Sequence, residues 1–215
     1  APSEMCIRDR SERGIRASHE ASLERLGLDR IDILYLHDPE EGPTEQAFEE
    51  ALPTLVAMRE EGLVRAIGVG SKDSAVLTRA VRTGLLDLAM VSGRYTLLEQ
   101  PAAAELLPAC QHHDVAVVAV SVFNSGILAR PEPPDDATYE YGQAPVAMLE
   151  RAREIAAIGR DHGVELPDLA IQFPLLHPAI RSVVLGMRTA AQVRSNIERM
   201  STPVPPEVWE RIDVR

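Results

Sequence analysis

Residues 33–40, ILYLHDPE, place His37 at the end of an apolar run, directly before an acidic residue and a proline. An imidazole can donate or accept a hydrogen bond near neutral pH, so it suits holding a substrate oxygen or moving a proton. An apolar run that stops at a proline is typical of a buried strand. The sequence therefore predicts a reactive side chain at a strand tip. The alternative is a histidine that only caps a backbone carbonyl.

Two later segments, SVFNSG (121–126) and GMRTAAQ (186–192), carry small polar side chains and glycine. Backbone N–H groups of the first can approach a phosphate closely. The second leads into a helix whose free N–H groups and positive dipole end favour an anion. Thr189 and Gln192 also fit a capping box, which would stabilise this helix without any ligand. The segments indicate a phosphate-binding edge or ordinary helix capping.

Five apolar runs can form the strands that position these side chains. They contain Val, Ile and Leu almost continuously, as expected for parallel strands that are covered on both faces. We expect strands at 31–38, 64–71, 86–94, 115–123 and 181–187.

Helical patterns separate these strands. Thr44 is the expected N-cap of the second helix and Gly62 its C′ residue, while Pro101 is expected in the first turn of the fourth. We expect helices at 18–27, 44–62, 74–84, 101–114, 144–163 and 189–200.

The alternation of strands and helices predicts parallel strands, in a doubly wound open sheet or a (β/α)₈ barrel. No GxGxxG follows any strand, which counts against the dinucleotide-binding open sheet. A barrel needs eight strands and about 250 residues, and five strands are found here. The expected fold is α/β, the C-terminal portion of a (β/α)₈ barrel with five βα units. Residues 130–145 are expected to form a flap over a strand end or a disordered insert.

Composition limits the partners. The 215 residues carry a net charge of −11 and no stripe of Lys or Arg, so we expect no nucleic acid partner. No apolar run approaches the roughly 20 residues of a membrane span. Two cysteines form no disulfide framework, which favours the cytoplasm. His112 and His113 are adjacent on a predicted helix and cannot share a metal, so we expect no metal site.

Five segments together resemble the aldo-keto reductases, which are (β/α)₈ barrels that use a nicotinamide cofactor. The segments are SLERLGLDRIDILYLHDP, LVAMREEGLVRAIGVGS, GRYTLL, VFNSGIL and VVLGMRTAAQVRSNI. The resemblance runs from about residue 14 to the C-terminus. Within the family, GRYTLLEQ, SVFNSGILA, ATYEY and IQFPLLHP look most similar to the D-threo-aldose 1-dehydrogenase group, which includes L-fucose dehydrogenase and pyridoxal 4-dehydrogenase.

The resemblance implies that His37 is the catalytic histidine, which orients the substrate oxygen. It also implies NAD or NADP as cofactor and a small sugar or aldehyde as substrate. Arg94 and Tyr95 are implied to line the sugar pocket, and a structural ion pair is the alternative for Arg94. The implied cofactor contacts are Gly70, Ser71, Ser92, Ser121, Phe123, Asn124, Ser125, Gly186, Met187, Arg188, Gln192 and Asn196.

Two positions near Arg188 depart from the pattern of the family. Arg188 could bind a 2′-phosphate, because a guanidinium forks onto phosphate oxygens. Gln192 and Gly186, however, stand where many NADPH-dependent members carry basic residues. The choice between NAD and NADP therefore stays open.

The other catalytic residues of the family are a tyrosine, a lysine and an aspartate, all upstream of the histidine. The residues before His37 contain no lysine, and their one tyrosine is Tyr35. Lys72, the only lysine, follows a different strand, and Tyr35 should lie about 6.6 Å deeper than His37. We expect neither to substitute. We therefore expect residues 11–215 to be an incomplete barrel domain and this fragment to be inactive. The opening APSEMCIRDR resembles translated sequencing adapter, so we expect residues 1–10 to be a non-native leader.

Three hypotheses follow for the function. The first is a cytoplasmic NAD(P)-dependent aldose 1-dehydrogenase as the full-length protein. The second is a non-catalytic cofactor-binding or interaction module on a reductase scaffold. The third, another barrel enzyme such as an aldolase or isomerase, is disfavoured because no strand-end lysine or metal cluster supports it.

Overall fold

The structure, a computed structural model, describes residues 9–212 of the chain. The described chain forms two compact units. The first runs up to Val91 and includes Glu105–Val117, and the second contains Ser92–Ala104 and everything from Val118 onward. The predicted leader lies outside the described residues except for Asp9 and Arg10.

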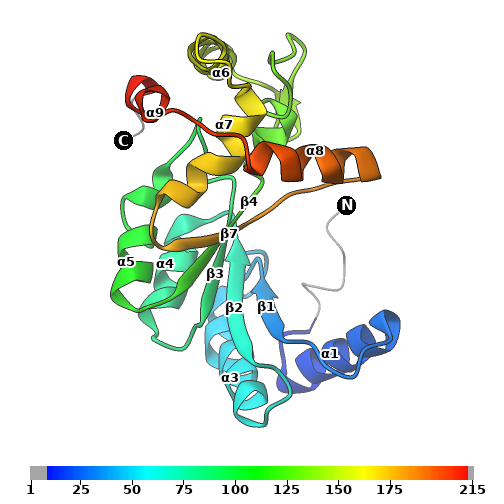
Figure 1. Cartoon of the computed structure of the whole chain (residues 1–215). Coiled ribbons are helices and arrows are strands. Elements are labelled where there is room, and N and C mark those ends of the chain that lie inside the picture. Colours follow the sequence, from blue (N-terminus) through cyan, green and yellow to red (C-terminus); the bar gives the residue numbers. More distant parts are fainter. Residues whose placement is uncertain (1–8, 213–215) are drawn as a thin grey trace. The chain divides into compact units, whose positions relative to one another are not determined.

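The first unit is built on parallel strands (Figure 1). β1 (Ile33–His37), β2 (Ala66–Ser71) and β3 (Leu88–Ser92) lie in the order β1-β2-β3, and β4 (Ala116–Val120) begins beside β3. The four predicted strands are thus confirmed, each shorter than its apolar run. In the register of β1 and β2, Tyr35 lies opposite Gly68 and His37 opposite Gly70.

Helices cover these strands. α3 and α4 pack against β2, and α5 packs against α4. Their buried side chains include Leu55 and Met58 from α3 and Leu77 from α4, which join Ile67 of β2 in the core. The helices of this unit are α1 (Glu12–Leu26), α2 (Thr44–Gln46), a π-helical turn η1 (Ala47–Ala51), α3 (Leu52–Glu60), α4 (Ser74–Arg82) and α5 (Leu106–His112).

Prolines divide two predicted helices. The helix expected at 44–62 contains a π-helical turn just before Pro53, whose nitrogen cannot donate to the carbonyl four residues earlier. The helix expected at 101–114 is split into a 3₁₀ turn, η2 (Pro101–Ala103), and α5. Pro108 explains this break, because its ring would clash with the carbonyl of Ala104 in a continuous helix.

Helix ends follow local capping chemistry, with two differences from expectation. α1 begins earlier than predicted because the Ser11 hydroxyl accepts a hydrogen bond from the N–H of Gly14. Thr44 is the first helical residue rather than the N-cap, since Pro43 occupies the cap position. Gly62 is confirmed as C′, with φ of 77°.

The second unit places β7 (Ile180–Val184) beside the end of β4. α6 packs against α7 and α9, and α7 packs against α8, as the yellow-to-red ribbons of Figure 1 show. α6, α8 and β7 were predicted, whereas α7, η4 and α9 were not. The other elements are η3 (Asn124–Gly126), β5 (Thr138–Tyr139), β6 (Gly142–Gln143), α6 (Val146–Arg160), α7 (Leu166–Gln172), η4 (Phe173–Leu176), α8 (Ala190–Met200) and α9 (Pro206–Ile212).

The segment expected as a flap or a disordered insert contains an ordered β-hairpin, formed by β5 and β6. Glu140 and Tyr141 connect its strands with φ of 44° and 69°. Two central residues with positive φ define a type I′ turn, which matches the twist of paired strands but favours Asn and Gly. The hairpin therefore keeps its turn despite two unfavourable residues, so other contacts must hold it.

Residues 9–212 contain neither a membrane-spanning helix nor a metal-binding group of side chains. None of the helices there combines the length and apolar character needed to cross a lipid bilayer. No group of three or more His, Cys, Asp or Glu side chains in the same residues is arranged to hold a metal ion.

Candidate functional site

His37 is the last residue of β1, and 60% of its side chain is exposed. Its Nε2 lies 3.3 Å from Oδ2 of Asp38. The chain turns sharply here, because Asp38 has φ of 42° and donates its N–H to the carbonyl of Gly70 at 2.8 Å. The imidazole thus lies at the carboxyl end of a parallel strand. In α/β proteins, ligands bind at this end of the strands.

Arg10 supports the loop that follows His37. Its guanidinium donates to the carbonyl oxygens of Asp38 at 2.8 Å and of Pro39 at 2.5 Å. The Arg10 residue is only 3% exposed, so these are buried, charge-assisted hydrogen bonds. The loop after β1 is therefore held by the side chain of a residue that precedes α1.

Gly70 and Ser71, both predicted to contact the cofactor, end the neighbouring strand β2. The Ser71 hydroxyl donates to the carboxylate of Glu40 and accepts the N–H of Asp73 at 2.8 Å. Ser71 is 3% exposed. The hydroxyl therefore has no further hydrogen to donate and keeps one lone pair, and the role of both residues stays a prediction.

In the second unit, the structure brings together two predicted cofactor-binding serines. The hydroxyl oxygens of Ser92, at the end of β3, and Ser121, after β4, lie 2.9 Å apart. The N–H of Gly93 donates to the carbonyl of Val120 at 3.0 Å, which aligns the two strand ends. These serines form a small hydroxyl pair at the carboxyl ends of adjacent strands.

Residues 121–126, here called the β4 loop, contain three left-handed residues. Ser121, Asn124 and Ser125 have φ of 58°, 46° and 57°. Such conformations cost roughly 1–2 kcal/mol each in residues other than glycine, so the surrounding contacts must hold them. Asn124 is 2% exposed, and its Oδ1 is buried with no hydrogen-bond partner among residues 9–212. Phe123 is partly buried beside it.

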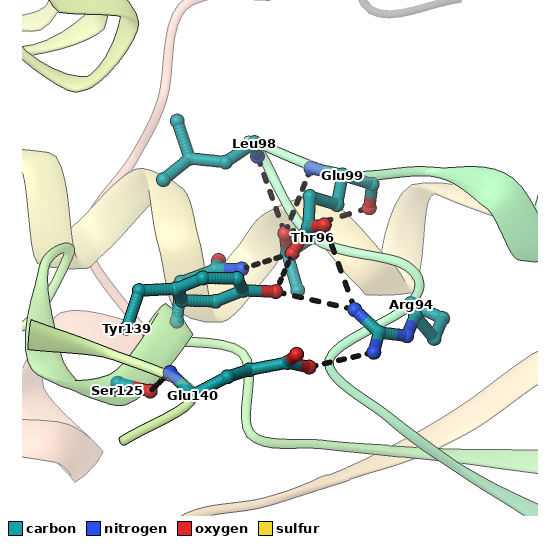
Figure 2. Close-up of polar contacts among 8 residues, drawn as sticks. Arg94, Thr96, Leu98, Glu99, Ser125, Tyr139 and Glu140 are labelled. Carbon is teal, nitrogen blue, oxygen red and sulfur yellow. Dashed lines mark hydrogen bonds and ion pairs between the residues drawn. The ribbon is translucent and has the colours of Figure 1, made fainter. Parts of the chain in front are cut away.

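A polar network connects the β4 loop with the hairpin and with the segment after β3 (Figure 2). Oε2 of Glu99 accepts hydrogen bonds from the Tyr139 hydroxyl and, at 3.1 Å, from Nδ2 of Asn124. Nη1 of Arg94 lies 3.5 Å from Oε1 of Glu99. We call Arg94, Glu99, Asn124 and Tyr139 the Glu99 cluster.

A tight turn after β3 positions the Glu99 carboxylate. The hydroxyl of Thr96 accepts the N–H groups of Leu98 at 3.2 Å and of Glu99 at 3.1 Å. The N–H of Thr96 donates to the carbonyl of Glu99 at 2.7 Å. Thr96 has no exposed surface. Its hydroxyl therefore acts as the local template for the turn, as Figure 2 shows.

Arg94 forms the structural ion pair that was the alternative to a role in the sugar pocket. Its guanidinium donates to Oε1 of Glu140 at 2.6 Å and to the Tyr139 hydroxyl at 3.2 Å. Tyr95 is 9% exposed and stacks on Phe173, with ring centroids 5.0 Å apart. The predicted sugar contacts of Arg94 and Tyr95 stay predictions.

The Tyr139 hydroxyl is poorly suited to act as an acid. Burial and the hydrogen bond to the Glu99 carboxylate raise the pKa of Tyr139 to about 12. General acid–base catalysis near neutral pH needs a pKa close to the working pH. Tyr139 therefore serves as a hydrogen-bond donor within the Glu99 cluster.

The predicted capping box at the start of α8 is confirmed. The Thr189 hydroxyl accepts the N–H of Gln192 at 3.2 Å, and Oε1 of Gln192 accepts the N–H of Arg188 at 2.7 Å and of Thr189 at 3.2 Å. The Gln192 oxygen is therefore engaged by the backbone. The Arg188 side chain is exposed, and so is Met187.

The remaining predicted contacts at this end are spread along one segment. Gly186 precedes α8 with no atom within 4 Å of the position that a side chain would occupy, and Asn196 lies on α8, partly buried. By helix geometry, the N–H groups of Ala190 and Ala191 have no acceptor within α8. An anion could be bound there, and the individual roles stay predictions.

Sequence reasoning missed Glu99, Tyr139 and Glu140. Glu99 lies within GRYTLLEQ, and the two others lie within ATYEY. Both segments carried the resemblance, but no role had been assigned to these side chains. The presence of a carboxylate in one motif and a phenol in another was the available signal.

Comparisons with known proteins identify the family of the chain. Residues 3–214 match the aldo/keto reductase family. The chain is 54% identical to a D-threo-aldose 1-dehydrogenase from a Pseudomonas species, over 95% of this chain and 62% of the relative. It is 33% identical to a pyridoxal 4-dehydrogenase from Microbacterium luteolum, over 94% of this chain and 61% of the relative.

A solved structure, an aldo-keto reductase from Bacillus halodurans in its apo form, matches with a TM-score of 0.77 at 25% identity. The match covers 94% of this chain and 67% of the solved chain. The chain thus spans about six tenths of the length of the curated relatives that it matches. The expected family is confirmed, and this chain belongs to the aldo/keto reductase family.

Proposed function

We propose that the protein is an NAD(P)-dependent oxidoreductase that oxidises a free aldose, or a similar aldehyde or alcohol, at C1. Hydride moves to C4 of the nicotinamide. Family membership and the 54% identity to a protein named D-threo-aldose 1-dehydrogenase support the reaction type and the substrate class. The observation that carries the proposal is the exposed imidazole of His37 at the end of β1.

His37 would hold the substrate oxygen by a hydrogen bond. Its ring is solvent-accessible, and the turn at Asp38 fixes the backbone from which it projects. Gly70 lies opposite His37 on β2, and an added Cβ there would be in ordinary contact with Met90 and with Cδ2 of His37 at 3.9 Å, so this side of the ring is already lined. We expect the substrate hydroxyl to approach the solvent-exposed side of the imidazole.

The proton would be taken by a different group. Tyr139 donates its hydrogen to Glu99, and burial raises the pKa of Tyr35, whose ring covers Gly68. Neither phenol is prepared to accept a proton near neutral pH. These two of the four tyrosines are therefore unsuited to the acid–base role, which supports the proposal that the chain alone turns over no aldose.

The second unit offers groups that fit a dinucleotide. The hydroxyls of Ser92 and Ser121 and the first turn of α8 can meet phosphate and ribose oxygens. The buried Oδ1 of Asn124 is an acceptor without a partner in the described chain, which a ribose hydroxyl could satisfy. The cofactor supplies the hydride-accepting ring, whereas these residues orient it. The cofactor is NAD or NADP, and the exposed Arg188 is the candidate for telling them apart.

A chimaera tests the function. The part of the Pseudomonas relative that this chain does not match would be fused in frame to residues 10–215, which keeps Arg10 under the loop after β1. We expect the chimaera to reduce NAD or NADP in the presence of a free aldose such as L-fucose, measured as absorbance at 340 nm. We expect the 215-residue chain alone to show no turnover. A matched chimaera with His37→Gln should lose at least about tenfold in kcat, because the substrate oxygen loses its positioning contact.

Two outcomes would contradict the proposal. One is a folded chimaera, with native-like circular dichroism and cooperative unfolding, that binds NAD or NADP but oxidises no aldose. That result would favour the non-catalytic module. The other is a His37→Gln chimaera with unchanged kcat. The cytoplasmic location stays a prediction.

A further inference from the structure

The Glu99 carboxylate receives side chains from three separate segments. Tyr139 comes from the hairpin, Asn124 from the β4 loop and Arg94 from the end of β3. An ionised carboxylate can only accept hydrogen bonds, so all three partners must present donors to it. Glu99 thereby fixes the orientation of each partner.

The consequence is sharpest for Asn124. Its Nδ2 donates to Glu99 at 3.1 Å, which leaves Oδ1 as the free end of the carboxamide. The residue is 2% exposed and has φ of 46°. A buried residue in the left-handed region needs contacts that repay its strain, and the hydrogen bond to Glu99 is such a contact.

The hairpin depends on the same carboxylate. Tyr139 donates to Glu99, and the N–H of Glu140 donates to the Ser125 hydroxyl at 3.4 Å. The carboxylate of Glu140 reaches only Arg94 among the described contacts of Figure 2. Glu99 therefore connects the hairpin with the β4 loop, whereas the Glu140 side chain supports the hairpin but makes no described contact with the β4 loop.

We propose that Glu99 is a positioning residue, which holds the β4 loop in its ligand-binding conformation through Asn124 and ties that loop to the hairpin through Tyr139. The cofactor role of the β4 loop rests on the proposed function. The coupling between Glu99, the loop and the hairpin does not. Glu99 itself need not contact the cofactor.

Hydrogen exchange measured by mass spectrometry on the 215-residue chain tests the coupling. Glu99→Gln removes the charge that strengthens the hydrogen bonds from Asn124 and Tyr139, and an amide whose oxygen keeps those two bonds must turn its NH2 group toward the Arg94 guanidinium. We expect faster exchange in both 121–128 and 137–144, with exchange in α5 unchanged. The matched control, Glu140→Ala, should accelerate only 137–144. Unchanged exchange in 121–128 of Glu99→Gln would overturn the proposal.

A swap of donor and acceptor guards against a merely unfolded variant. In Glu99→Gln with Asn124→Asp, the new amide can donate to the new carboxylate, and the net charge is unchanged. We expect exchange in 121–128 to return toward the wild-type rate.

If Glu99→Gln unfolds, as seen by faster exchange in α5, the Tyr139→Phe variant tests the coupling instead. It should loosen 137–144 with α5 protected, and no change there would overturn the coupling.

The link to the cofactor needs the active chimaera. There, Glu99→Gln should raise KM for the nicotinamide cofactor about tenfold, as expected for one weakened buried hydrogen-bond contact, with kcat and the KM for the sugar nearly unchanged. An unchanged cofactor KM, together with a loosened β4 loop, would overturn the positioning role while the oxidoreductase assignment stands. A wild-type chimaera without turnover would instead be a failure of the proposed function.

Discussion

The end of β1 and the Glu99 cluster present polar groups in two different ways. At the end of β1, the backbone sets the position of His37, through the register with Gly70 and the hydrogen bond from Asp38 to Gly70. In the Glu99 cluster, side chains up to 45 residues apart in the sequence hold one another. The first arrangement needs close packing beneath it, whereas the second needs a complete set of donors and acceptors. The two regions should therefore fail under different substitutions.

The largest expected effect lies beneath His37. A Cβ at Gly68 would lie 2.6 Å from Cε1 of Tyr35 and 2.8 Å from the carbonyl oxygen of Leu88. Gly68→Val should destabilise the fold by about 3 kcal/mol, because the ring of Tyr35 and the neighbouring strand cannot both move away. Urea unfolding at equilibrium measures this change.

Gly70→Ala is the matched control for that substitution. The nearest atom to a Cβ there is Cβ of Met90, at an ordinary contact distance of 3.7 Å. We expect a change within about 0.5 kcal/mol. Equal losses at the two glycines would show that strand conformation, rather than the ring of Tyr35, decides the cost.

The next effect concerns the turn that positions Glu99. Thr96→Val keeps the shape of the side chain but removes the oxygen that accepts two N–H groups in a fully buried position. We expect a loss of about 1–3 kcal/mol, together with faster hydrogen exchange at 96–99. Thr138→Val, at an exposed strand position, should be close to neutral. A neutral Thr96→Val would remove the template role of its hydroxyl.

A smaller, pH-dependent effect is expected at His177. Burial lowers the pKa of this imidazole below its usual 6.5, and its Nδ1 accepts the N–H of Ala179 at 3.2 Å. The folded state therefore binds the proton less readily than the unfolded chain. The neutral imidazole of His177 therefore contributes to the stability of the folded state. This stabilisation is fully present above about pH 6.5 and is lost as the pH falls through the pKa of His177 in the folded state.

Urea midpoints between pH 8 and pH 5 measure this dependence. The wild type should lose more stability on acidification than His177→Gln, which has no titrating group at that position. Identical pH dependence of the two proteins would mean that His177 does not contribute.

The smallest effect is a gain in stability at the hairpin. Tyr141 is fully exposed with φ of 69°, so its side chain adds strain without packing. Tyr141→Gly should stabilise the folded state by about 0.5 kcal/mol, because glycine adopts a positive φ without strain. The gain is small because glycine loses more backbone entropy on folding than tyrosine does. Thermal unfolding would show a small rise in Tm. A fall in Tm would indicate that the ring of Tyr141 makes a contact in solution.

The sequence predicted the parts of the fold that depend on local chemistry. Continuous Val, Ile and Leu runs located all five parallel strands, and Thr189 with Gln192 located the cap of α8. Pro53 and Pro108 could also have been used. A proline cannot donate to the carbonyl four residues earlier and clashes with it, which predicts the breaks within the two helices that periodicity alone had indicated as continuous.

The Glu99 cluster could not be predicted in the same way. Its members are polar residues in loops, where no periodicity indicates which side chains meet. Glu99 lies 25 residues from Asn124 and 40 from Tyr139, so the contacts depend on how three loops fold over one another. The place of His37 at the end of β1 could be predicted because the apolar run stops there, and its catalytic role stays a prediction.

The ring of Tyr35 over Gly68 makes these two positions one packing unit across neighbouring strands. The ring of Tyr35 occupies the space that a side chain at position 68 would need. The ring therefore fits only while residue 68 is glycine. Substitutions at positions 35 and 68 should therefore be coupled, because a smaller residue at 35 would permit a side chain at 68. A library randomised at both positions and selected for folding should return such exchanges far more often than either change alone.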